Sequence, residues 1–142
     1  MHRLVRPLHC VGFIAVASLL FAPITAISAD LDWGAVADVG SVHVLTTDGD
    51  GDARATKIWL LVLDGQGYIR TSRRSTWGDN VEHNPDIGLR IEGTDFPVRA
   101  TFIIDEVERA RIVAGFEEKY GSNPIMNFIR GDDPPIMRLE PR

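Results

Sequence analysis

Runs of apolar residues separated by turns rich in glycine and aspartate predict six β-strands between residue 41 and the C-terminus. The predicted strands cover residues 41–47, 53–65, 68–72, 87–91, 96–104 and 134–140, and residues 64–67 are predicted as the hairpin connection between the second and third strands. Residues 58–63 are continuously apolar, so we expect both faces of the second strand to be buried. In the fifth strand the apolar side chains alternate and should lie on one face of the sheet, namely Phe96, Val98, Ala100, Phe102 and Ile104.

Helical spacing predicts a main helix between the fifth and sixth strands. Asp105 forms a capping box with Glu108 at its start, and Gly121 ends it. Its apolar stripe recurs every three or four positions, at Val107, Ala110, Val113, Phe116 and Tyr120. Short helical segments are predicted over residues 31–40, with Asp32 as the N-cap, as one turn that Asn84 and Pro85 end, and over 125–129.

Strands joined by tight turns, with one main helix before the last strand, close most simply as a small antiparallel barrel. The predicted fold class is therefore mainly β with α (α+β): a six-stranded antiparallel split β-barrel with one main helix and short flanking helices.

Residues 1–29 have the layout of a secretory signal peptide. Arg3 and Arg6 precede an apolar stretch that starts at Val11, and Ala26 and Ala29 are small residues at which cleavage can occur. We predict cleavage after Ala29, which leaves residues 30–142 as a split-barrel domain in the periplasm or outside the cell. An uncleaved membrane anchor is the alternative, because residues 10–29 carry no charge.

Charge and cysteine content exclude several classes of protein. The chain has 142 residues, with 15 Lys and Arg against 20 Asp and Glu, so its net charge is −5. Removal of Arg3 and Arg6 with the leader gives 13 − 20 = −7, which argues against nucleic-acid binding. The single cysteine, Cys10, excludes an internal disulfide. After cleavage we expect no membrane contact.

The sequence contains no hydrolase, nucleotide-binding or metal motif. His43 reads as a residue of the first strand, and His83 as an exposed loop residue. Asp48, Asp50 and Asp52 have the spacing of a calcium loop, but the sixth and twelfth loop positions lack the required glycine and glutamate. No phosphate-binding glycine motif occurs, and no metal site is predicted.

The segment 68–85 is the most informative part of the chain for function. It combines arginines with hydroxyl side chains after a strand, at Arg70, Thr71, Ser72, Arg73, Arg74, Ser75 and Thr76. Guanidinium groups suit a phosphate or another anion because they donate hydrogen bonds in a planar fork. A helical turn starting near Trp77 would add backbone N–H donors. The alternative is an ordinary solvated loop.

The second strand carries candidate residues as well. Arg54, Thr56 and Lys57 precede its apolar run, and Lys57 shares one face with Trp59 because side chains alternate along a strand. These residues could contact the phosphate and the ring of a flat cofactor. The alternative is a strand end in solvent, with Trp59 in the core.

Residues 41–140 resemble the flavin-binding split-barrel superfamily of pyridoxamine 5′-phosphate oxidase and the deazaflavin-dependent nitroreductases, and most closely a small bacterial subgroup of uncharacterised proteins. The resemblance is carried by RATKIWLLVLDG, GYIRTS, RRSTW, WGDNVEHNP, IGLRIEGTDFPVRATFI and EKYG. It implies a six-stranded split barrel, usually a homodimer, with FMN or a deazaflavin in a cleft near the subunit interface.

The resemblance also implies roles for individual residues. Arg54, Thr56 and Lys57 would lie along the cofactor, with Trp59 beside them. Thr71 and Ser72 would lie beside the ring or the ribityl chain, and the phosphate loop would contain Arg73, Arg74, Ser75 and Trp77. Family members often have a lysine or arginine after the loop serine, whereas Thr76 and Trp77 follow Ser75 here. No catalytic residue is identified.

The predicted function is two-electron or hydride transfer from FMN or a deazaflavin to a small acceptor such as a quinone or nitro compound. Export raises an alternative, because most relatives of this fold work in the cytoplasm, where flavins are made. The alternative is an exported binding protein for haem or another flat ligand, without turnover. A third hypothesis is a structural dimer with a degenerate cleft.

Overall fold

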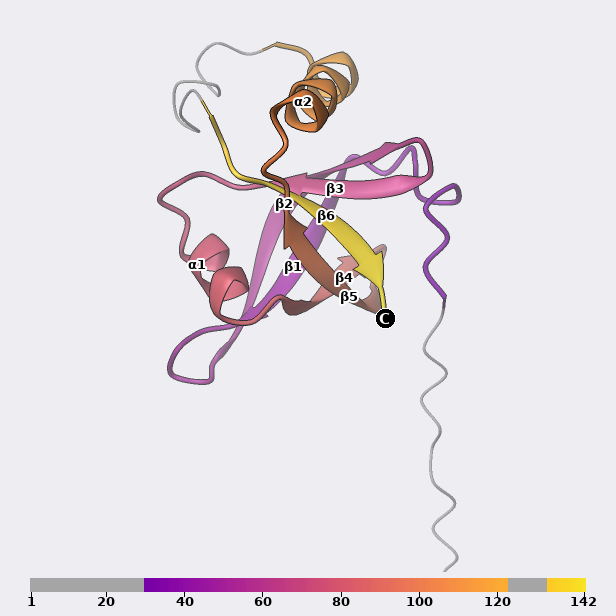
Figure 1. Cartoon of the computed structure of the whole chain (residues 1–142). Helices are drawn as coiled ribbons and strands as arrows, with labels where there is room; N and C mark the ends of the chain where they lie inside the picture. The colour runs from indigo at the N-terminus through magenta and orange to yellow at the C-terminus, as the bar shows by residue number, and fades with distance from the viewer. Residues whose placement is uncertain (1–29, 123–132) are drawn as a thin grey trace, which may run out of the picture.

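The computed structural model describes residues 30–122 and 133–142 (Figure 1). The predictions of a signal peptide over residues 1–29 and of a helical turn over 125–129 lie outside these residues. The described elements are six strands and two helices: β1 Ser41–Thr47, β2 Ala53–Leu63, β3 Gln66–Arg70, α1 Thr76–His83, β4 Asp86–Ile91, β5 Thr94–Phe102, α2 Glu106–Tyr120 and β6 Ile136–Pro141. Among them, no helix is both long and apolar enough to cross a membrane.

The six strands form one closed barrel in the order β1-β2-β3-β6-β5-β4, and every neighbouring pair is antiparallel. In Figure 1, α2 lies at the top of the barrel and α1 at its lower left. The predicted fold class, a six-stranded antiparallel barrel that is mainly β with α, is confirmed.

Alternation of apolar and polar residues places the core inside the barrel. In β1, Val42 and Val44 are buried, whereas His43 between them is exposed. The buried cluster inside the barrel also contains Leu60, Ile69, Leu89, Val98, Met137 and Leu139. Burial of these side chains is the main stabilising contribution, at about 25 cal/mol per Å² of apolar surface.

The long strand β2 has buried residues on both faces, as the sequence predicts. Leu60 belongs to the cluster inside the barrel, and Leu61 belongs to a second cluster on the outside. This second cluster includes Ile112 and Phe116, so it lies where α2 packs on the barrel. The residues on either side of Leu60 and Leu61 are half-buried.

α2 begins as predicted, and the later part of its predicted apolar stripe packs on the barrel, at Val113, Phe116 and Tyr120. The Asp105 carboxylate accepts a hydrogen bond of 2.7 Å from the Glu108 backbone N–H. The buried residues are Ile112, Gly115 and Phe116, whereas Val107 at the start of the predicted stripe is 80% exposed. The stripe is therefore wrong in its first part, because only the second half of the helix lies against the barrel.

The predicted helix over residues 31–40 is wrong, because the segment forms consecutive turns. The Val36 N–H donates to the Trp33 carbonyl at 3.3 Å, and the Val39 N–H donates to the Val36 carbonyl at 3.0 Å. Trp33 is buried against Gly67, where a Cβ atom would lie 2.3 Å from its indole ring. This tertiary contact holds the segment against the barrel.

Three smaller predictions also need correction. β3 begins at Gln66, because Asp64 and Gly65, with φ angles of 51° and 73°, form a two-residue hairpin turn. β5 ends at Phe102, so Ile104 does not continue its buried face and is 90% exposed. Thr76–His83 is a helix of eight residues rather than one turn.

Candidate functional site

The predicted site residues come from two segments on either side of an open edge of β2. Residues 53–59 of β2 pair with β1, whereas only residues 60–63 pair with β3. Within the described part of the chain, no strand pairs with the other edge of residues 53–59. The chain leaves β3 after Arg70, level with Trp59, and continues into the loop 71–75. The predicted site residues on β2 and those in the loop 71–75 therefore lie on the two sides of one opening of the sheet.

Of the two predicted cations on β2, one already has a carboxylate partner and the other does not. The Arg54 guanidinium binds the Asp48 carboxylate at 2.7 Å, and this contact is the largest cause of the lowered pKa of Asp48. Lys57 is exposed and has no carboxylate partner among the residues that the structure describes. Thr56 is half-buried opposite Val44. Of this group, Lys57 is the cation open to an anionic ligand.

Trp59 lies on the outer face of β2 and contacts α2. Its ring stacks on Tyr120 with centroids 4.6 Å apart and planes inclined by 5°. The Arg70 guanidinium lies 5.9 Å from the centre of the indole and 4.6 Å from the centre of the Phe116 ring. A flat ligand could therefore contact only the part of this half-buried indole that these neighbours leave open.

The hydroxyl groups of the loop 71–75 begin helix α1. Thr71 is buried, and its hydroxyl makes a short hydrogen bond with the Ser75 hydroxyl. Ser75 is the N-cap and accepts a hydrogen bond of 3.2 Å from the Gly78 N–H. Trp77 is buried in the barrel core. These side chains hold the loop in place, which leaves Ser72 and the arginines nearest to solvent.

The two arginines of the loop have different surroundings. Arg73 forms an ion pair of 3.3 Å with Asp133, a residue that Arg109 of α2 also binds. Arg74 is exposed and has no ion-pair partner in the described ranges. Arg74 in the loop and Lys57 in β2 are thus the two uncommitted cations of the predicted set.

Hydrogen bonds from the side chains of Lys119 and Tyr120 hold the end of α2 against the barrel beside Trp59. The Lys119 ammonium donates to the carbonyl oxygens of Ala37, Val39 and Leu60 at 2.8, 2.8 and 3.0 Å. The Tyr120 hydroxyl shares its single proton between the carbonyls of Gly40 and Leu60. Burial lowers the pKa of Lys119 and raises the pKa of Tyr120. Both groups tie α2 to β2 and to the turns before β1.

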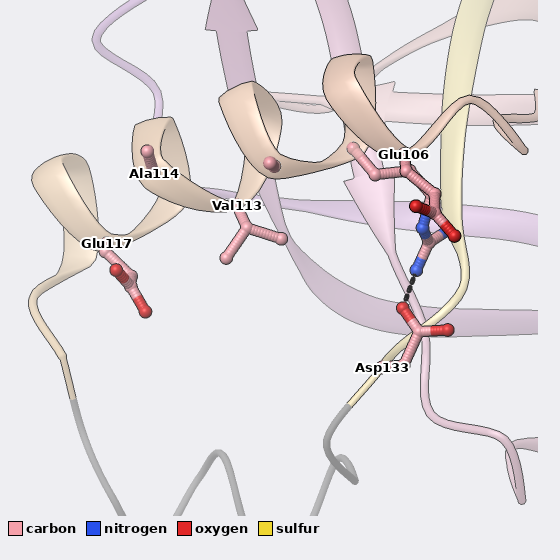
Figure 2. Close-up of a pocket in the computed structure, with 7 residues that line it drawn as sticks. Glu106, Val113, Ala114, Glu117 and Asp133 are labelled. Atoms are coloured by element: carbon pink, nitrogen blue, oxygen red, sulfur yellow. Dashed lines mark hydrogen bonds and ion pairs between the residues drawn. The ribbon is translucent and has the colours of Figure 1, made fainter.

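A pocket of about 440 Å³ lies along α2 (Figure 2). Its lining includes the apolar side chains of Ala110, Val113 and Ala114, with Glu106 and Glu117 among the charged residues. The dashed contact joins Arg109 to Asp133. None of the ten predicted site residues lines this pocket, although Arg73 contacts its wall at Asp133.

A second pocket, of about 270 Å³, lies between the β1–β2 turn and α1. It is lined by Thr47, Asp48, Gly49, Asp79, Asn80, His83 and Asn84. His83 is exposed as predicted, but it is the last residue of α1 rather than a loop residue, and its Nδ1 lies 2.8 Å from the Asp79 carbonyl oxygen. The described residues contain no group of three or more His, Cys, Asp or Glu side chains arranged to hold a metal ion.

His43 is a candidate that the sequence analysis assigned to the sheet alone. It is exposed on the outer face of β1, directly opposite Lys57 of β2 and Arg90 of β4. Its position between Val42 and Val44 indicated that it points away from the core. The register with Lys57, which no spacing in the sequence reveals, places it beside the predicted site.

No family model and no curated protein matches the chain, but several solved structures share its fold. ChuZ from Campylobacter jejuni matches with a TM-score of 0.61 and 20% identity over 72% of this chain and 48% of that one. HutZ, the heme storage protein from Vibrio cholerae, matches with a TM-score of 0.59 and 17% identity over 72% of this chain and 82% of that one. The F420-H2-dependent reductase FDR-A matches with a TM-score of 0.59 and 21% identity over 72% of this chain and 95% of that one.

The chain spans about half the length of ChuZ. The same barrel occurs in a protein from Listeria innocua named after pyridoxamine 5′-phosphate oxidase, with a TM-score of 0.56 and 13% identity. At these identities the comparisons establish the architecture that the sequence resemblance predicts. The chain has the split-barrel fold that pyridoxamine 5′-phosphate oxidase-like proteins, deazaflavin-dependent reductases and haem-binding proteins share.

Proposed function

We propose that this protein is an oxidoreductase that binds FMN or a deazaflavin at the open edge of β2. The observation that supports this most is the pair of uncommitted cations, Lys57 and Arg74, on the two segments that flank this edge. A phosphate beside Arg74 would receive charge-assisted hydrogen bonds, which are about twice as strong as neutral ones. One of the structures with this fold is named as a reductase.

The donor chemistry of the site fits an anionic cofactor in part. Arg74 and Ser72 would hold the phosphate, and Lys57 would lie nearer the ring. Thr71, Ser75 and Trp77 would support the loop from below, because their side chains are already engaged there. A bound flavin or deazaflavin would supply two-electron transfer to a small quinone or nitro acceptor.

One observation favours haem binding as a second candidate function. The exposed imidazole of His43 faces the side chain of Lys57 across two paired strands. Histidine is the commonest protein ligand of haem iron in oxygen-binding and peroxidase proteins, and a neighbouring lysine can pair with a propionate. Two structures with this fold are named for heme storage or heme binding.

Cofactor binding by the purified full-length chain tests the two functions. FMN, a deazaflavin and haem are each titrated while their absorbance and the protein fluorescence are followed. We expect FMN or the deazaflavin to bind, and Lys57→Gln and Arg74→Gln each to raise its Kd about tenfold, as the loss of one charge-assisted hydrogen bond predicts. Arg111→Gln is the matched control, because Arg111 is an exposed arginine paired with Asp64 elsewhere.

A failure to bind either flavin would contradict the proposed reductase. Haem binding whose spectrum is lost in His43→Ala would then support the second function. With a flavin bound, oxidation of the reduced cofactor by menadione should be faster with the protein than without it. A rate that the protein does not change would leave only a binding function.

We further propose that the protein works as a homodimer outside the cytoplasm, after cleavage following Ala29. One structure with this fold and 21% identity is a domain-swapped dimer. Native mass spectrometry of the protein from its own cells tests both proposals, because it measures the subunit number and the mass of the chain. A monomer would overturn the first, and a chain that retains residues 1–29 would overturn the second.

A further inference from the structure

Two neighbouring rows of side chains cross the outer face of the barrel. The first is the cationic row, which consists of Arg90, His43 and Lys57. In the strand register Arg90 lies opposite His43, and His43 lies opposite Lys57. The Cβ atoms of residues at such opposite positions lie about 5 Å apart, and all three residues are exposed. One anion can therefore contact two of them.

The charges of this row are unevenly balanced. Asp95 on β5 neutralises Arg90 through two contacts of 2.5 and 2.7 Å. His43 and Lys57 have no carboxylate partner in the residues that the structure describes. An acid group bound between these two residues would accept a hydrogen bond from the His43 ring and balance the charge of Lys57.

The second row is an apolar shelf, which consists of Pro97, Gly88, Leu45 and Ala55. These residues are opposite one another on β5, β4, β1 and β2, one row along from the cationic row. Gly88 has no side chain, and a Cβ there would lie 3.1 Å from the side chain of Leu45. Pro97 and Ala55 are exposed. The shelf is thus low and apolar, with cations along one side.

We propose that the acceptor of this protein is a flat aromatic acid that lies on the outer face of β1 and β2. Its ring would contact the apolar shelf, and its carboxylate or sulfonate would bind His43 and Lys57. This inference rests on the proposed reductase function and names its class of substrate. The phosphate of the cofactor has the same anionic chemistry, so the experiment separates these two sources.

Binding of a probe to the full-length chain tests the site without any turnover. The probes are anthraquinone sulfonate and a neutral anthraquinone of the same size, both titrated at low salt. We expect the sulfonate to bind about tenfold more tightly, since an ionised acceptor strengthens each hydrogen bond. His43→Gln and Lys57→Gln should each remove most of this preference, whereas His83→Gln on α1 should not. Equal affinity for both probes would overturn the inference.

A substitution on the shelf gives a second and independent result. Ala55→Glu places a bulky negative group beside the cationic row on an exposed position, where the fold should tolerate it. We expect it to weaken sulfonate binding at least tenfold without changing the unfolding transition. Unchanged sulfonate binding in Ala55→Glu would show that the probe binds elsewhere and would overturn the inference.

Steady-state kinetics with the reduced cofactor distinguish the acceptor from the cofactor as the source of the anion. His43→Gln should raise KM for the sulfonated acceptor and leave the Kd of the cofactor unchanged. A raised Kd of the cofactor with an unchanged KM for the acceptor would show that the cofactor phosphate binds His43 and Lys57. That result would overturn the inference without contradicting the proposed reductase function. Absence of turnover would overturn the proposed reductase, while the probe titration still decides whether the anion site exists.

Discussion

The ring of Tyr120 at the end of α2 lies parallel to the indole of Trp59 on β2, with centroids 4.6 Å apart. The Tyr120 hydroxyl also donates to the Gly40 carbonyl at 2.5 Å. The stack and this hydrogen bond attach the helix to the barrel at one place. The same contact limits what the indole can offer a ligand, so the position of α2 and the shape of the candidate site are coupled.

Substitutions of Tyr120 should separate the stack from the hydrogen bonds. Tyr120→Phe keeps the ring and loses the hydroxyl, so we expect a loss of about 1 kcal/mol in the free energy of unfolding. Tyr120→Ala also removes the stacked ring and should cost about 3 kcal/mol. Urea unfolding measures both. Equal losses in the two variants would show that the stack contributes nothing.

Lys119 attaches the same end of α2 to the barrel through hydrogen bonds. Its ammonium donates to three backbone carbonyls, on Ala37, Val39 and Leu60. Lys119→Met keeps an apolar stem and removes this donor from the Ala37 and Val39 carbonyls, whereas the Leu60 carbonyl keeps the Tyr120 hydroxyl, so we expect a loss of about 2 kcal/mol in unfolding free energy. Lys119→Gln retains an amide donor and should lose about half as much. Hydrogen exchange of the turns before β1 should increase in Lys119→Met.

Gly67 is the point where the segment before β1 meets the barrel. A Cβ at this position would lie 2.3 to 2.7 Å from three ring atoms of Trp33. Gly67→Ala should therefore displace the buried indole, at a cost of about 2 kcal/mol, and shift its fluorescence toward that of an exposed tryptophan. Gly49→Ala is the control, since nothing lies within 4 Å of a Cβ there.

A double substitution tests the cause of that effect. If the clash with Trp33 destabilises Gly67→Ala, the same change should cost much less in a Trp33→Leu background, because the two residues are in contact and their effects are not additive. If the two losses in unfolding free energy are additive, the destabilisation by Gly67→Ala comes from the β3 backbone and not from the contact with Trp33.

Much of the fold could be predicted from the sequence because its strands have clear local signals. The alternation of Val42, His43 and Val44 fixes which face of β1 is buried, and Asp64 and Gly65 provide the turn that a two-residue hairpin needs. The errors lie where a distant contact decides the outcome. Trp33 packs on Gly67, so the segment around it forms turns rather than a helix.

The candidate site was less predictable for the same reason. Residue types in the loop indicated hydroxyl and cationic groups, but not that Thr71 and Ser75 would bond to each other. Arg73 and Arg109 both bind Asp133, although the loop, the helix and the segment before β6 lie far apart in the sequence. The register that places His43 opposite Lys57 is likewise a property of the assembled sheet.

The lowered pKa of Asp48 makes the stability of the fold depend on pH in the acid range. Asp48 accepts hydrogen bonds from Arg54 and from the backbone of Asp50 and Asp52, and the Arg54 contact contributes most to its lowered pKa. A carboxyl whose pKa is lower in the folded state stabilises the fold at pH values above its ordinary pKa of about 4. This contribution decreases as the pH falls through that value and is lost below the lowered pKa.

Asp48→Asn removes the titration and keeps the oxygen that accepts from the turn. We therefore expect the wild-type chain to be more stable than the variant at neutral pH, and the difference to shrink as the pH falls below about 4. Unfolding by urea at a series of pH values measures the difference directly. Asp30→Asn, which also removes one exposed carboxylate, is the control. A difference that stays constant down to about pH 2 would show that the ion pair with Arg54 does not stabilise the fold.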